Sequence, residues 1–145
     1  MASLEENKAV VRQAYEEAWN KRNLDALDNL LPLDYAISGA TGEESGRDVI
    51  KGVIRRYHAA FPDLHVEIED LIAEGDKVVM RGRWSGTHEG EMETSYGMAK
   101  PTLKRIEWVG THIFRVRDGR IAEAIYNTDF LSLYQQLGII PTPQS

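Results

Sequence analysis

The stretch RIEWVGTHIFRVRDGRIAEAIYNTDF, residues 105–130, decides the fold. Apolar and polar residues alternate along 105–117 and again along 120–128, a period that is typical of strands with one buried face. The dipeptide Asp118-Gly119 separates the two runs, and Asp-Gly in this position is a strong hairpin signal. The stretch therefore predicts two long antiparallel strands joined by a tight turn.

Two further strands are predicted before this hairpin. Residues 64–69 alternate between apolar and polar side chains, and a turn at 74–77 leads into a second run whose even-numbered residues are apolar or aromatic, at 78–88. The segment 89–103 is predicted to be a loop. Loops of this length are often lids or binding loops, although its apolar residues could instead close a dimer interface.

Helical spacing of apolar residues dominates the first part of the chain and returns at its end. Helices are predicted over 3–21, 24–31, 47–61 and 130–137. A brief strand at 35–37 and a Gly/Ser/Glu-rich loop at 38–46 separate the second helix from the third. Helices followed by a meander of antiparallel strands indicate an α+β fold. Three helices against one curved sheet would enclose a cone, and a hollow cone is a natural small-molecule site.

The composition limits the classes of function. The 145 residues are 42% hydrophobic and 28% charged, which suits one domain spanning 1–145. A net charge of −6 makes nucleic acid and anionic membranes poor partners. The absence of cysteine excludes disulfides, thiol nucleophiles and zinc–thiolate sites. No apolar run resembles a membrane span or a signal peptide, so we expect a cytoplasmic protein.

Known catalytic motifs are missing from the sequence. It contains no Gly-rich phosphate loop and no His-Glu-x-x-His motif, and its four histidines are scattered. We therefore expect neither a metal nor an organic cofactor. Any chemistry would rest on isolated acids, bases and aromatic residues.

Asp129 is the leading candidate for an acid–base residue. It lies between the last strand and the final helix. At the mouth of an apolar cone its carboxyl group would be partly desolvated, with a raised pKa, and could shuttle a proton. Asp is also a very common helix N-cap residue, and that interpretation stays open.

His112 is the candidate partner of this carboxylate. A hairpin without irregularities pairs His112 with Ile125 and Trp108 with Asp129, all on one face. His112 would then lie roughly 13 Å along the strand from Trp108, too far to touch Asp129. A β-bulge would shift the register and could change the face. His112 could equally be a half-buried sheet histidine.

Aromatic residues on the predicted inward faces form a candidate ligand platform. They are Tyr15, Trp19, Tyr57, Trp84 and Trp108. Each is also a usual core residue, but three Trp and six Tyr in so small a domain suit a flat, apolar guest. His88 shares the parity of Trp84 and is expected either at the rim of the cavity or as a solvated loop residue.

Four runs of the sequence follow one another in a characteristic order. They are Phe61-Pro62-Asp63-Leu64, RGRWSGTHEG at 81–90, GTHIFRVRDGRI at 110–121, and the ending from Asp129 to Gly138. In order and spacing they resemble the SnoaL-like polyketide cyclases, also called the ester cyclase family. The resemblance implies an NTF2-like (ketosteroid-isomerase-like) α+β cone. By analogy it also implies a homodimer formed through the exposed sheet face.

The resemblance further implies an intramolecular aldol cyclisation. In that reaction Asp129 would act as general acid and base, His112 would assist it, and Tyr15, Trp84 and Trp108 would line the pocket. Many relatives carry His-Trp where this chain has Ala124-Ile125, next to the pocket.

Two hypotheses follow for the function. In the first, Asp129 removes a proton next to a carbonyl, His112 or Asn127 stabilises the enolate, and a polyketide-like ligand closes a ring. A hydrolase or isomerase that uses the same base is a close variant. In the second, the domain binds a ligand or dimerises without catalysis, and Asp129 is only a helix cap.

Overall fold

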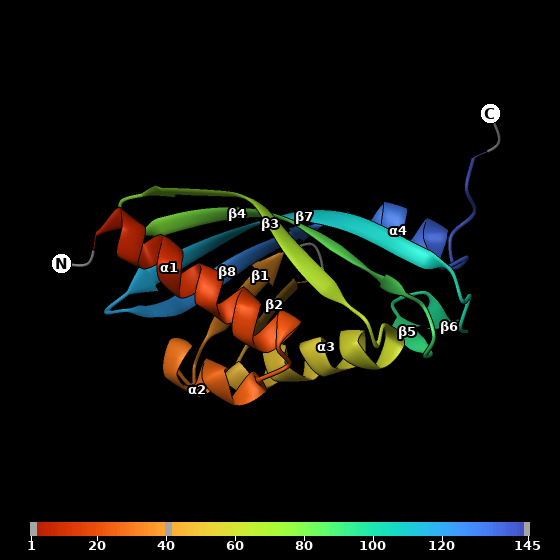
Figure 1. The fold of residues 1–145 in the computed structure, drawn as a ribbon, viewed down its shortest axis with the longest axis horizontal. Coiled ribbons are helices and arrows are strands. Elements are labelled where there is room, and N and C mark those ends of the chain that lie inside the picture. The colour runs from red at the N-terminus through yellow and green to blue at the C-terminus, as the bar shows by residue number, and fades with distance from the viewer. Residues whose placement is uncertain (1–2, 40–41, 144–145) are drawn as a thin grey trace.

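The computed structural model describes residues 3–39 and 42–143. A curved six-stranded sheet, in the order β2-β1-β8-β7-β4-β3, covers the helices α1, α2 and α3 (Figure 1). The helices are α1 (Leu4–Ala14), continued by a π-helical turn (Tyr15–Asn20), a 3-10 turn (Leu24–Ala26), α2 (Leu27–Leu30), α3 (Arg47–Ala60) and α4 (Phe130–Gln136). The strands are β1 (Ala36–Gly39), β2 (Gly42–Ser45), β3 (His65–Glu74), β4 (Lys77–Thr87), β5 (Met92–Thr94), β6 (Gly97–Ala99), β7 (Arg105–Arg117) and β8 (Arg120–Thr128).

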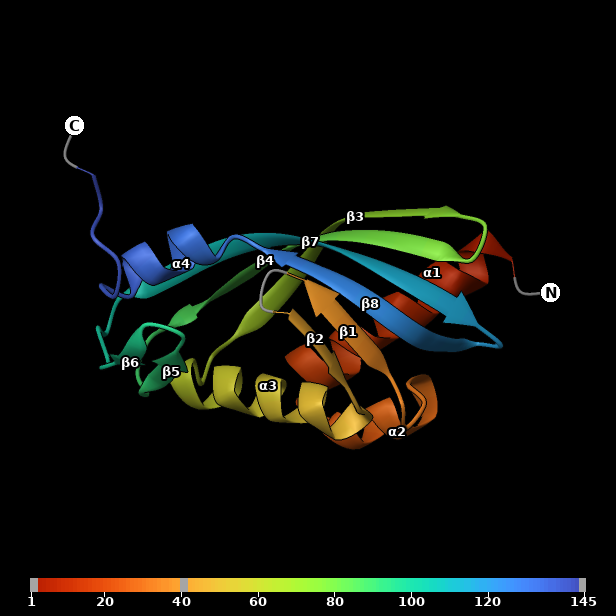
Figure 2. The same cartoon turned by 180° about the vertical axis from the view of Figure 1, so that it is seen from behind.

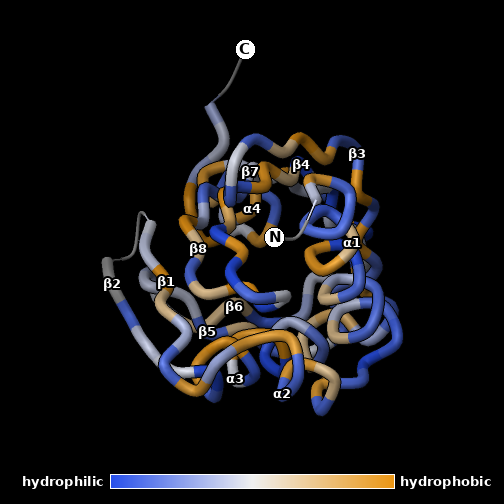
Figure 3. The backbone as a smooth tube through the Cα atoms, turned by 90° about the vertical axis from the view of Figure 1, so that its left-hand side faces the viewer, coloured by the Kyte–Doolittle hydropathy of each residue, from blue (hydrophilic) through white to orange (hydrophobic). Residues whose placement is uncertain are grey.

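This arrangement is the predicted α+β cone. Seen end-on, β1, β8, β7, β4, β3 and α1 follow one another around the core, and α2 and α3 close the remaining side (Figure 3). All strand pairs are antiparallel except β1 with β8, which run parallel. None of the helices in the described residues is long and apolar enough to span a membrane.

A β-bulge in the β7–β8 hairpin overturns the predicted register. Next to the turn, Arg117 pairs with Arg120, as predicted, but Ala122 is an extra residue on β8. Beyond the bulge His112 pairs with Tyr126, not with Ile125. Because side chains alternate between faces, a slip of one residue turns every later side chain of β8 to the other face.

The burial of β8 follows from this slip. Tyr126 and Thr128 lie on the inner face together with His112, whereas the side chain of Ile125 is 44% exposed. The predicted shared face of Trp108 and Asp129 is therefore wrong.

Two segments predicted as loops contain short strands. The segment 38–46 includes β2, which pairs with β1, although residues 40 and 41 lie outside the described residues. The segment 89–103 forms a small hairpin of β5 and β6, which packs near α3 at one end of the sheet (Figure 2).

The predicted alternation along β4 is confirmed. Val78, Met80 and Trp84 are buried in the core, and the intervening residues face outward. On that outer face Arg81 pairs with Asp70 of β3 at 2.7 Å. The unbroken period of two therefore places a tryptophan on the inner face of the sheet, above the helices.

Asn20 fastens the end of the π-helical turn to the free edge of β3. Its Nδ2 donates to the carbonyl oxygen of Val66 at 2.9 Å, and its Oδ1 accepts from the Val66 N–H at 2.8 Å. One amide side chain thus satisfies both backbone groups of an edge residue and holds the first helix against the sheet.

Replacing Asn20 should therefore destabilise the fold. We expect Asn20→Ala to lower the free energy of unfolding by about 2 kcal/mol, since two backbone groups lose their partners. Lys21→Ala is the matched control, because Lys21 makes only an exposed ion pair with Glu17, worth about 0.5 kcal/mol or less. Urea denaturation measures both variants, and equal losses would contradict the role assigned to Asn20.

Candidate active site

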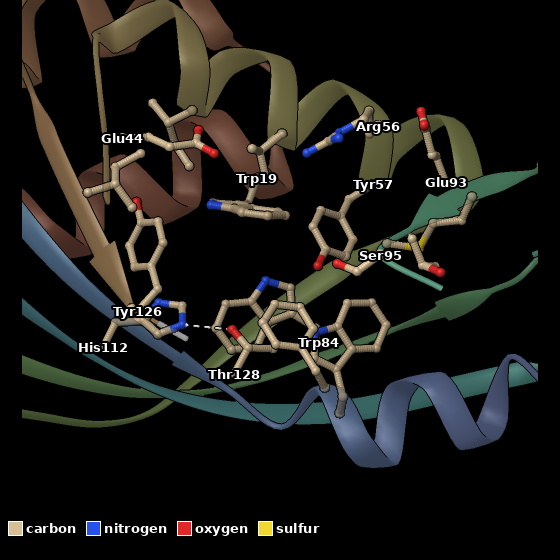
Figure 4. Close-up of a pocket in the computed structure, with 18 of the residues that line it drawn as sticks. Trp19, Glu44, Arg56, Tyr57, Trp84, Glu93, Ser95, His112, Tyr126 and Thr128 are labelled. Carbon is tan, nitrogen blue, oxygen red and sulfur yellow. Dashed lines mark hydrogen bonds between the residues drawn. The ribbon is translucent and has the colours of Figure 1, made fainter. Parts of the chain in front are cut away.

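A cavity of about 460 Å³ lies between the inner face of the sheet, the π-helical turn and α3 (Figure 4). The five aromatic residues expected to form a ligand platform all line it. They are Tyr15, Trp19, Tyr57, Trp84 and Trp108. All three tryptophans of the chain are thus at one cavity.

The π-helical turn positions the first two of these rings. The N–H of Lys21 bonds to the carbonyl oxygen of Glu16, five residues back, at 2.9 Å, so the turn is wider than in an α-helix. Tyr15 and Trp19 point into the core from this turn, with ring planes 9° apart and centroids 6.3 Å apart. π-Helical turns occur often at functional sites.

The rings also hold one another in place. Trp19 meets Trp84 edge to face at 6.1 Å, and Tyr57 stacks on Trp108 at 5.7 Å. Such pairs add stability beyond the area that they bury. The cavity therefore has flat, apolar walls whose side chains are already ordered.

His112 lies at the sheet side of the cavity between two hydroxyl groups. Its Nδ1 is 2.9 Å from Tyr15 Oη, and its Nε2 is 3.3 Å from Thr128 Oγ1. The imidazole is only 5% exposed. The bulge at Ala122 is what brings Thr128 to this face. Tyr15, His112 and Thr128 form what we call the neutral chain.

Burial keeps these groups uncharged. It lowers the pKa of His112 to about 3. It also raises the pKa of Tyr15 well above its usual range, and the nearby Tyr126 adds to this effect. At neutral pH the neutral chain therefore carries no charge.

A neutral imidazole donates through one nitrogen and accepts through the other. If Tyr15 donates to Nδ1, then Nε2 donates to Thr128, whose own hydroxyl proton has no acceptor among the described residues. If Thr128 donates to Nε2 instead, the hydroxyl proton of Tyr15 is the one left over. In either tautomer one hydroxyl proton is available to a guest in the cavity, and the two tautomers interconvert by moving protons along the chain.

The structure does not bring Asp129 to His112. Asp129 is exposed, does not line the cavity, and caps α4 by accepting from the Ser132 N–H at 3.0 Å. Asn127 is likewise exposed and outside the cavity lining. The bulge explains both placements, since it turns the odd-numbered residues at the end of β8 outward.

His88 takes neither of its two predicted positions. It is completely buried and does not line the cavity. Its Nδ1 accepts from the Thr102 N–H at 3.0 Å, and its ring packs on Phe61. The alternation of β4 continues past Thr87, so His88 stays on the inner side, where it holds the segment that leads into β7.

Sequence reasoning missed three residues that line the cavity: Tyr126, Thr128 and Arg56. The sequence carries no clear signal for the first two, because the run Ile121-Ala122-Glu123-Ala124-Ile125 fits either register, and only the structure shows that the buried residues Ile121 and Ala124 are three apart. Among the described residues, no three His, Asp or Glu side chains gather closely enough to hold a metal ion.

Comparison with known proteins now gives the family. Residues 9–137 match the family model described as SnoaL-like polyketide cyclase. The chain belongs to this family. The resemblance inferred from the four sequence runs is thus confirmed, and so is the NTF2-like cone. No curated protein matches this chain significantly.

Solved structures share the fold along nearly the whole chain. AclR from Streptomyces galilaeus is 28% identical, with a TM-score of 0.85 over 99% of this chain and 87% of that one. IdmH from Streptomyces antibioticus is 29% identical, with a TM-score of 0.76 over 91% of this chain and 98% of that one. A hydroxylase activity is suggested for AclR and a polyketide cyclase activity for IdmH.

The buried His112 should make stability depend on pH. Its pKa is about 3 in the fold against an ordinary value of 6.5 for histidine, so between these values the unfolded chain binds more protons and the free energy of unfolding falls as the pH falls. From pH 7 to pH 5 this group alone accounts for a loss of about 2 kcal/mol. Urea denaturation of the wild type and His112→Gln at both pH values measures it. We expect a smaller loss in the variant, and equal losses would refute the assignment.

Proposed function

We propose that this SnoaL-like protein binds a flat, largely apolar carbonyl compound of the polyketide type and catalyses its aldol-type ring closure. The observation that carries the proposal is the neutral chain, in which a buried His112 joins two hydroxyl groups that both line an aromatic cavity. The family supports the class of reaction.

The aromatic walls support the class of ligand. Stacked and edge-on rings provide a flat apolar surface, and a cavity of about 460 Å³ is within the usual range for small molecules. Folding one flexible chain of carbonyl groups against Trp19, Trp84 and Trp108 would bring two of its carbons together. This positioning supplies a large part of the rate advantage of an intramolecular reaction.

The neutral chain can move the protons that a ring closure requires. An enolised 1,3-dicarbonyl compound carries an O–H group. When its carbon attacks a carbonyl carbon further along the same molecule, a C–C bond forms and the C=O π bond breaks. The enol proton passes to one hydroxyl of the chain, and the other hydroxyl gives its proton to the new alkoxide oxygen. His112 changes tautomer, and no charged residue is formed.

An apolar surrounding strengthens this arrangement. A hydrogen-bond donor stabilises a developing negative charge more strongly where water is excluded. Burial also opposes formation of an imidazolium or a phenolate. The buried Tyr15 and His112 are therefore suited to donate and accept without ionising.

The position of Asp129 favours a second candidate function. A carboxylate that caps α4 at the surface is the arrangement expected of a ligand-binding or dimerisation domain without catalysis. For Asp129 to act as the base, its side chain would have to leave Ser132 and turn inward.

Substitutions distinguish these possibilities. The probe is 1-phenylhexane-1,3,5-trione, whose aldol closure and loss of water give 5-phenylresorcinol. We expect the wild type to accelerate this closure, and Tyr15→Phe to lower kcat/KM by about 100-fold, the usual effect of losing one donor to a developing oxyanion. Asp129→Asn should stay within about twofold of the wild type, because Asn caps helices as well as Asp. Chromatography of 5-phenylresorcinol measures the rates.

Two other outcomes would contradict the proposed role of the neutral chain. Loss of turnover in Asp129→Asn with turnover kept in Tyr15→Phe would restore Asp129 as the acid–base residue. A folded wild type that binds the trione without accelerating its closure would support the binding domain.

The outer face of the sheet supports the proposal of a homodimer. Ile72, Val79, Ile113 and Ile125 are paired across β3, β4, β7 and β8 and form an outer apolar row. Ile72 is 61% exposed. A second copy would remove this row from water, which favours association.

Charge on the outer apolar row should break the dimer. We expect the wild type to sediment as a dimer at micromolar concentration and Ile125→Glu as a monomer, since two added carboxylates would be buried together. Leu33→Glu, at a more exposed site between α2 and β1, should remain dimeric. A wild type that sediments as a monomer would disprove this interface.

A further inference from the structure

Arg56 is a charged residue at the cavity that the ring closure does not use. It comes from α3, lines the cavity, and extends toward Trp19 on the side opposite His112 and Thr128 (Figure 4). It is exposed to solvent, so its guanidinium remains hydrated when the cavity is empty.

Arg56 differs from Arg47 and Lys51, two cations earlier on α3. Arg47 and Lys51 both pair with Asp28, at 3.3 Å and 2.5 Å. Arg56 forms no ion pair with any residue in the described part of the chain, and it stacks on no aromatic ring there. Its charge is therefore not compensated within those residues.

Two phenol groups lie near this guanidinium. Burial raises the pKa of Tyr57, with a further contribution from Tyr134, and the positive charge of Arg56 opposes the rise. Burial also raises the pKa of Tyr134, and Arg56 again opposes it. Ser95 lines the cavity next to Tyr57 (Figure 4). Arg56 thus stands among neutral hydroxyl groups that can add hydrogen bonds to an anion.

We infer that Arg56 binds a carboxylate of the ligand at the mouth of the cavity, with Tyr57 and Ser95 as additional donors. The inference rests on the proposed function and names its substrate class: a flat polyketide-type molecule that carries a free acid rather than an ester at one end. With the acid held at Arg56, the far carbonyl groups reach the neutral chain on the opposite side.

A carboxylate fits this end better than a phosphate. The planar fork of one guanidinium matches the two oxygens and the single charge of a carboxylate. A phosphate monoester carries a charge of about −1.5 to −2 at neutral pH. The cavity lining has no second cation to pair with this additional charge, because its other charged residues are Glu44 and Glu93.

Glu93 is expected to weaken the binding of the acid without preventing it. It lies on β5, is exposed, and lines the cavity on the same side as Arg56 (Figure 4). A like charge near the ligand carboxylate raises the free energy of the complex, though solvent screens it. Removing Glu93 should therefore act in the opposite direction to removing Arg56.

A matched pair of probes tests the inference. Naphthalene-2-carboxylate and naphthalene-2-carboxamide have the same flat body, and only the first is charged. The three tryptophans all line the cavity, so their indole N–H signals in ¹H–¹⁵N spectra report occupancy and yield Kd. We expect the carboxylate to bind the wild type about tenfold more tightly than the amide, as one charge-assisted contact provides.

Variants then assign this preference to a residue. Arg56→Gln should reduce it to within about twofold, leaving the Kd of the amide unchanged, since only the charge-assisted contact is lost. Arg55→Gln removes the same charge from the adjacent exposed residue, which does not line the cavity, and should keep the preference. Glu93→Gln should tighten binding of the carboxylate about twofold to fivefold, because it removes a nearby like charge.

Equal affinity of the two probes for the wild type would overturn the inference, as would a preference that survives Arg56→Gln. Both results would leave the proposed function intact. If neither probe moved the indole signals, the aromatic cavity would not be a site for flat apolar ligands, and the proposed function would fail with the inference.

Discussion

One extra residue on β8, Ala122, determines which side chains reach the cavity. Without the bulge, Ile125 and Asp129 would face inward and Thr128 would face solvent. With it, Thr128 and Tyr126 stand beside His112, and Asp129 is free to cap α4. Because of the bulge, the hydroxyl of Thr128 faces the cavity in place of the carboxylate of Asp129. A bulge reverses the face of every residue that follows it on the strand. A bulge near the turn therefore determines which side chains reach the cavity several residues away.

The aromatic walls and the neutral chain depend on each other. An imidazole can be buried at low cost only if both nitrogens have partners, and Tyr15 and Thr128 provide them. The π-helical turn aims Tyr15 at the imidazole and Trp19 at Trp84. In return, the rings exclude water and make ionisation of His112 costly. A site of this kind suits reactions in which protons are passed between neutral groups.

Local patterns predicted most of the elements but not the face of each residue. The strands of the β7–β8 hairpin follow from alternation and an Asp-Gly turn, and the burial along β4 follows from an unbroken period of two. A bulge in this hairpin was named as an alternative, but its position was not predicted because Ala122 has no distinctive turn chemistry, unlike Gly or Asn. The parallel pairing of β1 with β8 is a long-range contact that no local pattern encodes. Arg56 was overlooked because a charged residue beside an apolar helical stripe looks like part of a solvated face.

Desolvation explains the order of groups along the cavity. Deep against the sheet, where water is excluded, the polar residues are neutral and pair with one another. The charged residues of the lining, Arg56, Glu44 and Glu93, are instead exposed to solvent, which compensates their charge. A guest with one charged end and one apolar end therefore has a single favourable orientation, since burying its charge beside His112 would cost several kcal/mol. The same penalty that keeps the neutral chain uncharged thus also directs how a ligand enters.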